Sequence, residues 1–187
     1  MVAHDEAVFG RPPESLPMHH PAPPTRAPSS TGLRTEAFDF TRRRDRIRFL
    51  DIGDVFYRKD RNYISPLRLQ MEKFLNPAKN PAFEHLEVRP IAMFRNGKAV
   101  GRLTVQVDSD FERHNGRRIG FFGFFESVDE RGVAHLMLDE GLAWLKERGC
   151  VEVLGPANFN LTHQAGLLVK NFDRPPFVEE LYNPPLL

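Results

Sequence analysis

The sequence contains a single cysteine, Cys150, among its 187 residues. One thiol cannot form an intramolecular disulfide or a zinc site built from several cysteines, so a reducing, cytoplasmic compartment is expected. No metal site is expected, because His19 and His20 have no third ligand near them in the sequence. No apolar stretch approaches the roughly 20 residues that a helix needs to cross a bilayer. The acidic N-terminus also lacks the apolar region of a secretory signal.

The chain also lacks a strong charge of either sign, since its formal net charge is +1. Such a chain has no long-range field that would attract nucleic acid or an acidic membrane. The dense basic run at residues 42–48 is interrupted by Asp45 and is predicted to lie on an exposed edge. We therefore expect neither nucleic acid nor a membrane as a partner.

Phenylalanine is abundant, with sixteen residues against three tyrosines. Hydrophobic residues make up 41% and charged residues 27%, so the composition predicts a globular domain with an aromatic core. The first forty residues differ, because seven of the sixteen prolines lie there. Such a segment buries too little apolar surface to offset the entropy of ordering it. Residues 1–40 are therefore predicted to be a disordered arm and residues 41–187 a single domain.

Periodicity and turn residues predict a mixture of strands and helices. Asn96 and Gly97 are the strongest local signal, because Asn-Gly between apolar runs is typical of a tight hairpin. They join two predicted strands at 87–94 and 98–107. The other predictions before residue 117 are a strand at 46–52, a short helix or turn at 54–60, a helix at 66–76 and a loop at 108–116.

Residues 117–160 are predicted to form a strand, a helix and a second strand. The first strand, 118–125, is too apolar for one face in water and is expected to be buried on both faces. Ser127 and Glu130 have the spacing of a capping box, which opens a helix that ends at Gly149. A strand at 150–154 then returns parallel to the first. This arrangement predicts a ligand site where the first strand ends and the helix begins, and a helix N-terminus suits an anion.

Five short motifs occur in an order that is shared with a known family. They are Asn-Tyr-Ile-Ser-Pro at 62–66, Gly-Phe-Phe-Gly-Phe-Phe-Glu at 120–126, Gly-Pro-Ala-Asn at 155–158, Gly-Leu-Leu-Val at 166–169 and Tyr-Asn-Pro-Pro at 182–185. With the element order, they resemble an uncharacterised bacterial branch of the GNAT superfamily of N-acetyltransferases. The resemblance implies an α+β (α/β) fold with a mixed, mostly antiparallel sheet flanked by helices. The family's last helix and strand have no counterpart here, so the fold is expected to be incomplete at the C-terminus.

The resemblance also implies a site for acetyl-coenzyme A as co-substrate. In the family the backbone after the fourth strand pairs with the pantetheine arm, and the loop that opens the next helix wraps the pyrophosphate. The matching positions are Phe125, Glu126, Ser127 and Val128 for the arm, and Arg131, Gly132 and Val133 for the loop. The loop has one glycine where two are usual, and Asp129 and Glu130 add negative charge to it.

Acyl transfer to an amine needs a base, and Glu126 at the strand end is the first candidate. His163, in the polar loop after the last strand, is the second. Asn158 and Asn160 in the same region are candidates for binding the acceptor, although they could instead satisfy the loop backbone.

Two functions follow from these residues. The first is an N-acyltransferase that acts on a small-molecule or peptide amine. The second is a catalytically inactive binding or interaction module, which the acidic, glycine-poor loop favours. A sheet edge left uncovered at the C-terminus predicts self-association.

Overall fold

A computed structural model describes residues 32–177 and 180–184 of the chain. Most of the predicted arm, residues 1–31, lies outside the described residues. Residues 33–40 belong to the fold, because they form the strand β1 (Leu33–Ala37) and bury the rings of Phe38 and Phe40. The fold therefore begins before the predicted boundary at residue 41.

Five strands form one sheet in the order β1-β2-β3-β4-β5. Neighbours are antiparallel from β1 through β2 (Leu86–Arg95) and β3 (Lys98–Asp108) to β4 (Ile119–Ser127). The last strand, β5 (Glu152–Leu154), is parallel to β4. The predicted mixed, mostly antiparallel sheet is thus confirmed, as is the parallel return after the long helix.

The hairpin between β2 and β3 forms at the predicted dipeptide. Asn96 and Gly97 both have positive φ angles, 50° and 77°, which a tight hairpin turn requires at its two central positions. The two strands then pair from Arg95 opposite Lys98 down to Leu86 opposite Asp108. Residues 108–116, predicted as a loop, instead contain the short helix α3 (Ser109–Asn115), which the side chain of Asp108 caps.

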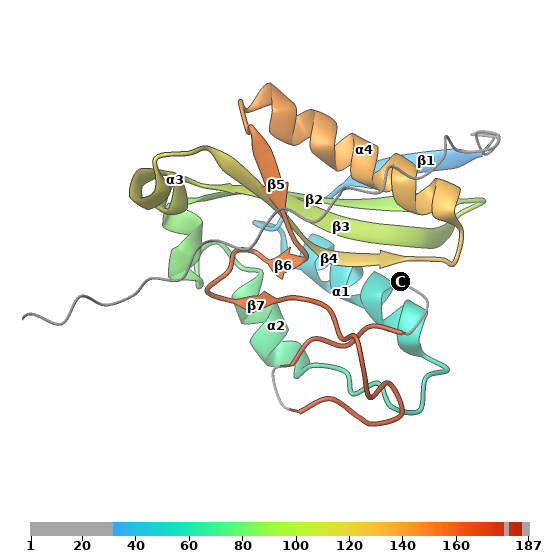
Figure 1. The fold of residues 1–187 in the computed structure, drawn as a ribbon. Helices are drawn as coiled ribbons and strands as arrows, with labels where there is room; N and C mark the ends of the chain where they lie inside the picture. Colours follow the sequence, from blue (N-terminus) through green and yellow to red (C-terminus); the bar gives the residue numbers. More distant parts are fainter. Residues whose placement is uncertain (1–31, 178–179, 185–187) are drawn as a thin grey trace, which may run out of the picture.

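Helices cover both faces of the sheet (Figure 1). On one face lies α4 (Arg131–Glu147), and on the other lie α1 (Arg43–Tyr57) and α2 (Arg68–Phe74). The predicted strand at 46–52 is wrong, because these residues belong to α1. Phe49, Ile52 and Gly53 are buried at the three- and four-residue spacing of a helix face, and Arg46 is buried with them. Among the described residues, no helix has the length and apolar character needed to cross a membrane.

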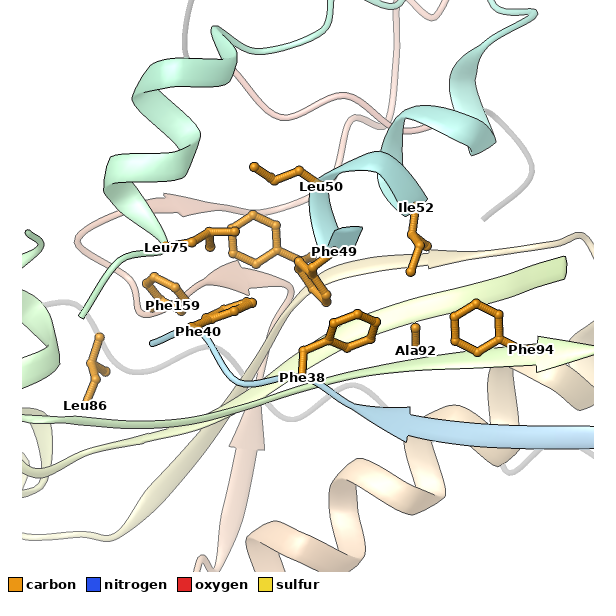
Figure 2. Packing of buried hydrophobic residues seen from close by; sticks show 11 residues of the cluster. Phe38, Phe40, Phe49, Leu50, Ile52, Leu75, Leu86, Ala92, Phe94 and Phe159 are labelled. Carbon is orange, nitrogen blue, oxygen red and sulfur yellow. The ribbon is translucent and has the colours of Figure 1, made fainter. Parts of the chain in front are cut away.

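The core between α1 and the sheet is built from aromatic rings, as predicted from the composition. Phe49 is fully buried at its centre, with Phe38, Phe40 and Phe124 around it at centroid distances of 5.8, 5.2 and 5.9 Å. Figure 2 shows this cluster between the helices and the sheet. Phe159, from the segment after β5, completes it and stacks on Phe74 at 4.9 Å.

The other face is covered by α4, whose Val133, Met137 and Leu145 are fully buried. The predicted capping box is wrong. Glu130 is itself the N-cap position, and its carboxylate bonds to Arg95 rather than to the helix backbone. The Ser127 hydroxyl donates to the carbonyl oxygen of Val128.

Short elements complete the chain: the 3-10 helix η1 (Pro81–Glu84) precedes β2, and two strands follow β5. These strands, β6 (Ala157–Asn158) and β7 (Gln164–Ala165), form an antiparallel pair of their own. The segment from β6 onward lies on the α1 and α2 face of the sheet (Figure 1).

Candidate active site

The end of β4 is irregular in a way that positions a carboxylate. Its parallel pairing with β5 stops at Phe121 opposite Leu154, where β5 ends, and the segment after β5 then follows β4, with Asn158 accepting from the N–H of Phe124. On its other edge the register with β3 shifts between Arg102 and Thr104, and Phe124 has a φ of 47°. Such bulges re-aim side chains at the rims of sheets. Here Phe124 and Glu126 both come to face α1, while Phe125 packs on the α4 side.

Glu126 lines a cavity of about 90 Å³ on the α1 and α2 face. Its walls come from α1, the loop after α1, α2, Arg102 of β3, the end of β4, Asn158 and Gln164 of the β6–β7 pair, and residues 176 and 180–182. A space of this size holds several water molecules, so it admits a small polar group but not a long alkyl chain. Within the described residues, no group of three histidine, cysteine or acidic side chains is placed to hold a metal ion.

A buried ion pair forms the floor of this cavity. The guanidinium of Arg102 donates from Nε and Nη2 to the two carboxylate oxygens of Glu126, at 2.5 and 3.0 Å. The two side chains are only 8% and 13% exposed. Arg102 also donates from Nη1 to the carbonyl oxygen of Phe49 at 2.5 Å, and its guanidinium lies 4.8 Å from that residue's ring centroid.

Gly53 makes room for this arginine. A Cβ at that position would lie 2.1 Å from Nη2 of Arg102, so only a glycine fits beneath the guanidinium. Period-two alternation along β3 would place Arg102, Thr104 and Gln106 together on a polar side facing solvent, yet all three are buried. The polar face of β3 is covered by α1 and the segment after β5, and Gln106 donates there to the carbonyls of Ala157 and Phe159.

All three tyrosines of the chain meet at the cavity, which the sequence did not predict. The ring of Tyr57 stacks on Tyr63 with a centroid distance of 4.4 Å and meets Tyr182 edge-on at 5.8 Å. The Tyr63 hydroxyl donates to Asp54 at 3.2 Å, and the Tyr182 hydroxyl donates to Asp60 at 2.5 Å. Burial raises the pKa of Tyr57 well above its usual range, and the nearby carboxylate of Glu126 adds to this rise. Tyr57 therefore keeps its proton at physiological pH.

Of the candidate catalytic and acceptor residues, the structure brings Glu126 and Asn158 together at the cavity. Asn158 is buried, accepts from the backbone N–H of Phe124 at 2.8 Å and donates to Gln164 at 3.2 Å. It therefore holds the bulged end of β4 in place. Its amide group is thus engaged with the backbone of β4 and the side chain of Gln164.

His163 and Asn160 lie elsewhere. His163 is not among the cavity-lining residues, and its ring meets Phe74 edge-on at a centroid distance of 5.1 Å. Burial lowers its pKa, and its Nδ1 is buried without a hydrogen-bond partner in the described structure. Asn160 donates to the buried carboxylate of Asp108 at 2.7 Å and accepts from Thr162, so it stabilises a loop.

The predicted cofactor residues surround the start of α4. Arg131 and Gly132 are its first two residues, whereas Val133 is buried beneath it. The backbone N–H of Val128 donates to the carbonyl of Val100 at 2.9 Å and is already used within the sheet.

A cation from a distant strand offsets part of the negative charge of this loop. Arg95, at the end of β2, bonds to both carboxylate oxygens of Glu130 at 2.8 Å. Arg131 is therefore not the only cation available to offset Asp129 and Glu130.

The strand order, the parallel β4–β5 pair and the helices on both faces are those of the GNAT acetyltransferases, and the chain has this fold. No family model matches the sequence. Two curated proteins are related to it in sequence. One is the bacterial ceramide synthase of Caulobacter vibrioides, 35% identical over 132 residues, which cover 70% of this chain and 34% of that protein. The other is protein YghO of Escherichia coli, 31% identical over 137 residues, covering 73% and 35%.

The chain thus spans about a third of the length of these curated relatives. Among solved structures, an aminoglycoside acetyltransferase from a soil metagenomic sample, in complex with sisomicin, aligns with a TM-score of 0.48 at 15% identity, covering 69% of this chain and 80% of that one. An acetyltransferase from Clostridium acetobutylicum with acetyl-coenzyme A aligns with a TM-score of 0.46 at 14% identity, covering 67% and 80%.

Proposed function

We propose that this chain carries the site of an N-acyltransferase that moves an acyl group from acyl-coenzyme A to an amine. The observation that supports this most is the position of Glu126, a carboxylate near the end of β4 that lines a small cavity. The relationship to a bacterial ceramide synthase adds support, because a ceramide is the N-acyl derivative of a long-chain amino alcohol. We infer that the acceptor is an amine of this class.

The donor would lie along the end of β4 and the start of α4. The N-terminus of α4, with Arg131 and Gly132, would hold the pyrophosphate, since unpaired helix N–H groups and the helix dipole favour phosphates. Arg95 supports this by offsetting the charge of Glu130. The pantetheine arm would lie along Phe125, Glu126 and Ser127 on the edge of β4 that faces away from β3, whereas the N–H of Val128 is already bonded. Coenzyme A supplies the thioester.

The acceptor would enter from the α1 and α2 face. Its nitrogen attacks the thioester carbonyl carbon, the C–N bond forms, the C–S bond breaks, and the nitrogen loses a proton. The carboxylate of Glu126 is the group in the cavity that would take up this proton. The hydroxyl of Tyr57, whose pKa is raised by burial, keeps its proton and would donate a hydrogen bond to the leaving thiolate, which takes its proton from Glu126 or solvent.

The alternative, a catalytically inactive binding module, is favoured by two contacts. Glu126 already accepts two hydrogen bonds from Arg102, so both of its carboxylate oxygens are engaged. Asn158 occupies the N–H of Phe124, on the edge of β4 where a donor's arm would lie.

Calorimetric titration of the purified chain with acetyl-coenzyme A and with a long-chain acyl-coenzyme A separates the two functions. We expect saturable binding of at least one donor, and amide formation with a long-chain amino alcohol detected by mass spectrometry. Absence of binding at millimolar donor would favour the inactive module.

In the active case, we predict that Glu126→Gln retains donor binding and lowers the rate of amide formation about 10²-fold, the usual contribution of a general base. Glu147→Gln is the matched control, because Glu147 is exposed near the end of α4 and has no ion pair in the described part of the chain. Tyr57→Phe keeps the ring packing and removes only the hydroxyl. Equal rates for Glu126→Gln and Glu147→Gln would exclude Glu126 as the base.

A further inference from the structure

Two segments that are distant in sequence form one end of the molecule. Residues 58–69 follow α1, and residues 166–177 follow β7; Figure 1 shows them together at the end opposite α4. Asn62 donates to the carbonyl of Phe172 at 3.0 Å, and Tyr182 bonds to Asp60. Asn183 holds the second segment by accepting from the N–H of Leu168 at 2.8 Å and donating to its carbonyl. We call the outer surface of these two segments the loop face.

The loop face exposes an unusual share of apolar side chains. Of the ten large hydrophobic residues that are exposed in the described part of the chain, six lie on it: Ile64, Leu67, Leu69, Leu167, Val169 and Phe177. Leu67 is 75% exposed and Phe177 is 88% exposed. Exposed apolar groups gathered in this way mark a contact surface, because single ones are normally scattered.

The same face is basic, although the chain as a whole is nearly neutral. Residues 58–69 and 166–177 hold six basic and two acidic residues, a net charge of +4 against +1 for the full sequence. Arg68 is paired with Asp51 and Asp54. The other five are exposed and have no ion pair within the described residues: Arg58, Lys59, Arg61, Lys170 and Arg174.

Residues of the two loop-face segments also line the cavity. Ile64 and Pro66 from the first segment and Pro176 from the second line it, next to Tyr182. A partner that covers this face would therefore meet the cavity directly.

We propose that the loop face docks on an anionic lipid surface. Protruding apolar side chains enter the boundary between headgroups and acyl chains, while the unpaired cations around them meet the lipid phosphates. This charge complementarity favours a membrane over a second copy of the chain, whose own loop face would repel it. The nearly neutral net charge led to the expectation of no membrane partner, because that number averages over residues that the fold separates.

Docking in this way would present the cavity at the level of the headgroups. An amine carried on a lipid could then reach Glu126 while its alkyl chain stays in the bilayer, a consequence that rests on the proposed acyl transfer. The docking itself does not rest on it.

Vesicle co-sedimentation of the purified full chain tests the proposal. We expect binding to vesicles of phosphatidylcholine and phosphatidylglycerol in equal parts, much weaker binding to phosphatidylcholine alone, and loss of binding as salt is raised. Lys170→Glu and Phe177→Ser should each weaken binding about tenfold, since each removes a surface contact of the expected kind. Lys98→Glu and Val151→Ser are the controls, because these exposed residues lie outside the loop face, and they should leave binding unchanged.

Three results would overturn the proposal. They are no binding to either vesicle, binding that anionic lipid does not strengthen, and equal losses in the controls and the loop-face variants. Sedimentation velocity without lipid tests whether a second copy of the chain binds the loop face instead. A dimer that Phe177→Ser dissociates would show that it does. Acetyl-coenzyme A binding by the same samples reports on the donor site separately, so failure of one proposal is distinguishable from failure of the other.

Discussion

Arg102→Ala is expected to lower the free energy of unfolding by about 3–5 kcal/mol, the usual cost of removing one partner of a buried ion pair. Glu126 would keep its charge in a site where its side chain is 13% exposed, with both hydrogen bonds from Arg102 lost. The carbonyl of Phe49 would lose its donor as well. Urea unfolding followed by circular dichroism and by the fluorescence of Trp144 measures the change.

Two further variants separate the ion pair from other contributions. Arg117→Ala breaks an exposed pair with Glu152, whose partners are 60% and 41% exposed, and should change stability by less than about 1 kcal/mol. The double variant Arg102→Leu with Glu126→Leu removes both buried charges and should lose far less than Arg102→Ala alone, because no charge is left unpaired. If Arg102→Ala matched Arg117→Ala, the buried pair would not stabilise the fold.

Local signals in the sequence predicted the sheet well. The Asn96–Gly97 turn, the aromatic strand before Glu126 and the return of a parallel strand all depend on residues near one another in the chain. Side-chain period and turn chemistry are sufficient for such elements. The position of Glu126 near a strand end followed from the same reasoning, whereas the cavity that it lines is on the α1 and α2 face and not at the start of α4.

The parts that the sequence did not predict depend on distant partners. Helix α1 was mistaken for a strand because Arg46 is buried, bonded to the carbonyls of Phe40 and Thr41, where a helix face would normally carry an apolar residue. The burial of Arg102 could not be read from the strand itself, because its partner Glu126 lies 24 residues away. Tyr57, Tyr63 and Tyr182 come together only when the segment after β7 folds back over α1. Charge and ring clusters of this kind leave no periodic pattern in the sequence.

Gly123→Ala is the second large effect that we expect, and it tests how closely β6 approaches β4. A Cβ on Gly123 would lie 2.0 Å from the carbonyl oxygen of Ala157 and 3.0 Å from the side-chain oxygen of Asn158. The first of these is a backbone atom, so the strand carrying Asn158 has to move. We expect a loss of about 3 kcal/mol in the free energy of unfolding, at the upper end of the range for overpacking.

Gly120→Ala on the same strand is the matched control for this substitution. Its Cβ would meet the ends of the Leu145 side chain at 2.8 Å, and a side chain can turn where a backbone cannot. We expect a loss of about 1 kcal/mol there, measured by the same urea unfolding. Because Asn158 accepts from the N–H of Phe124, moving it should also disturb the bulge that aims Glu126 into the cavity. Gly123→Ala should therefore weaken acyl-coenzyme A binding more than Gly120→Ala does. If the two variants had equal effects on unfolding and on acyl-coenzyme A binding, the contact of β6 with β4 would not position the bulge.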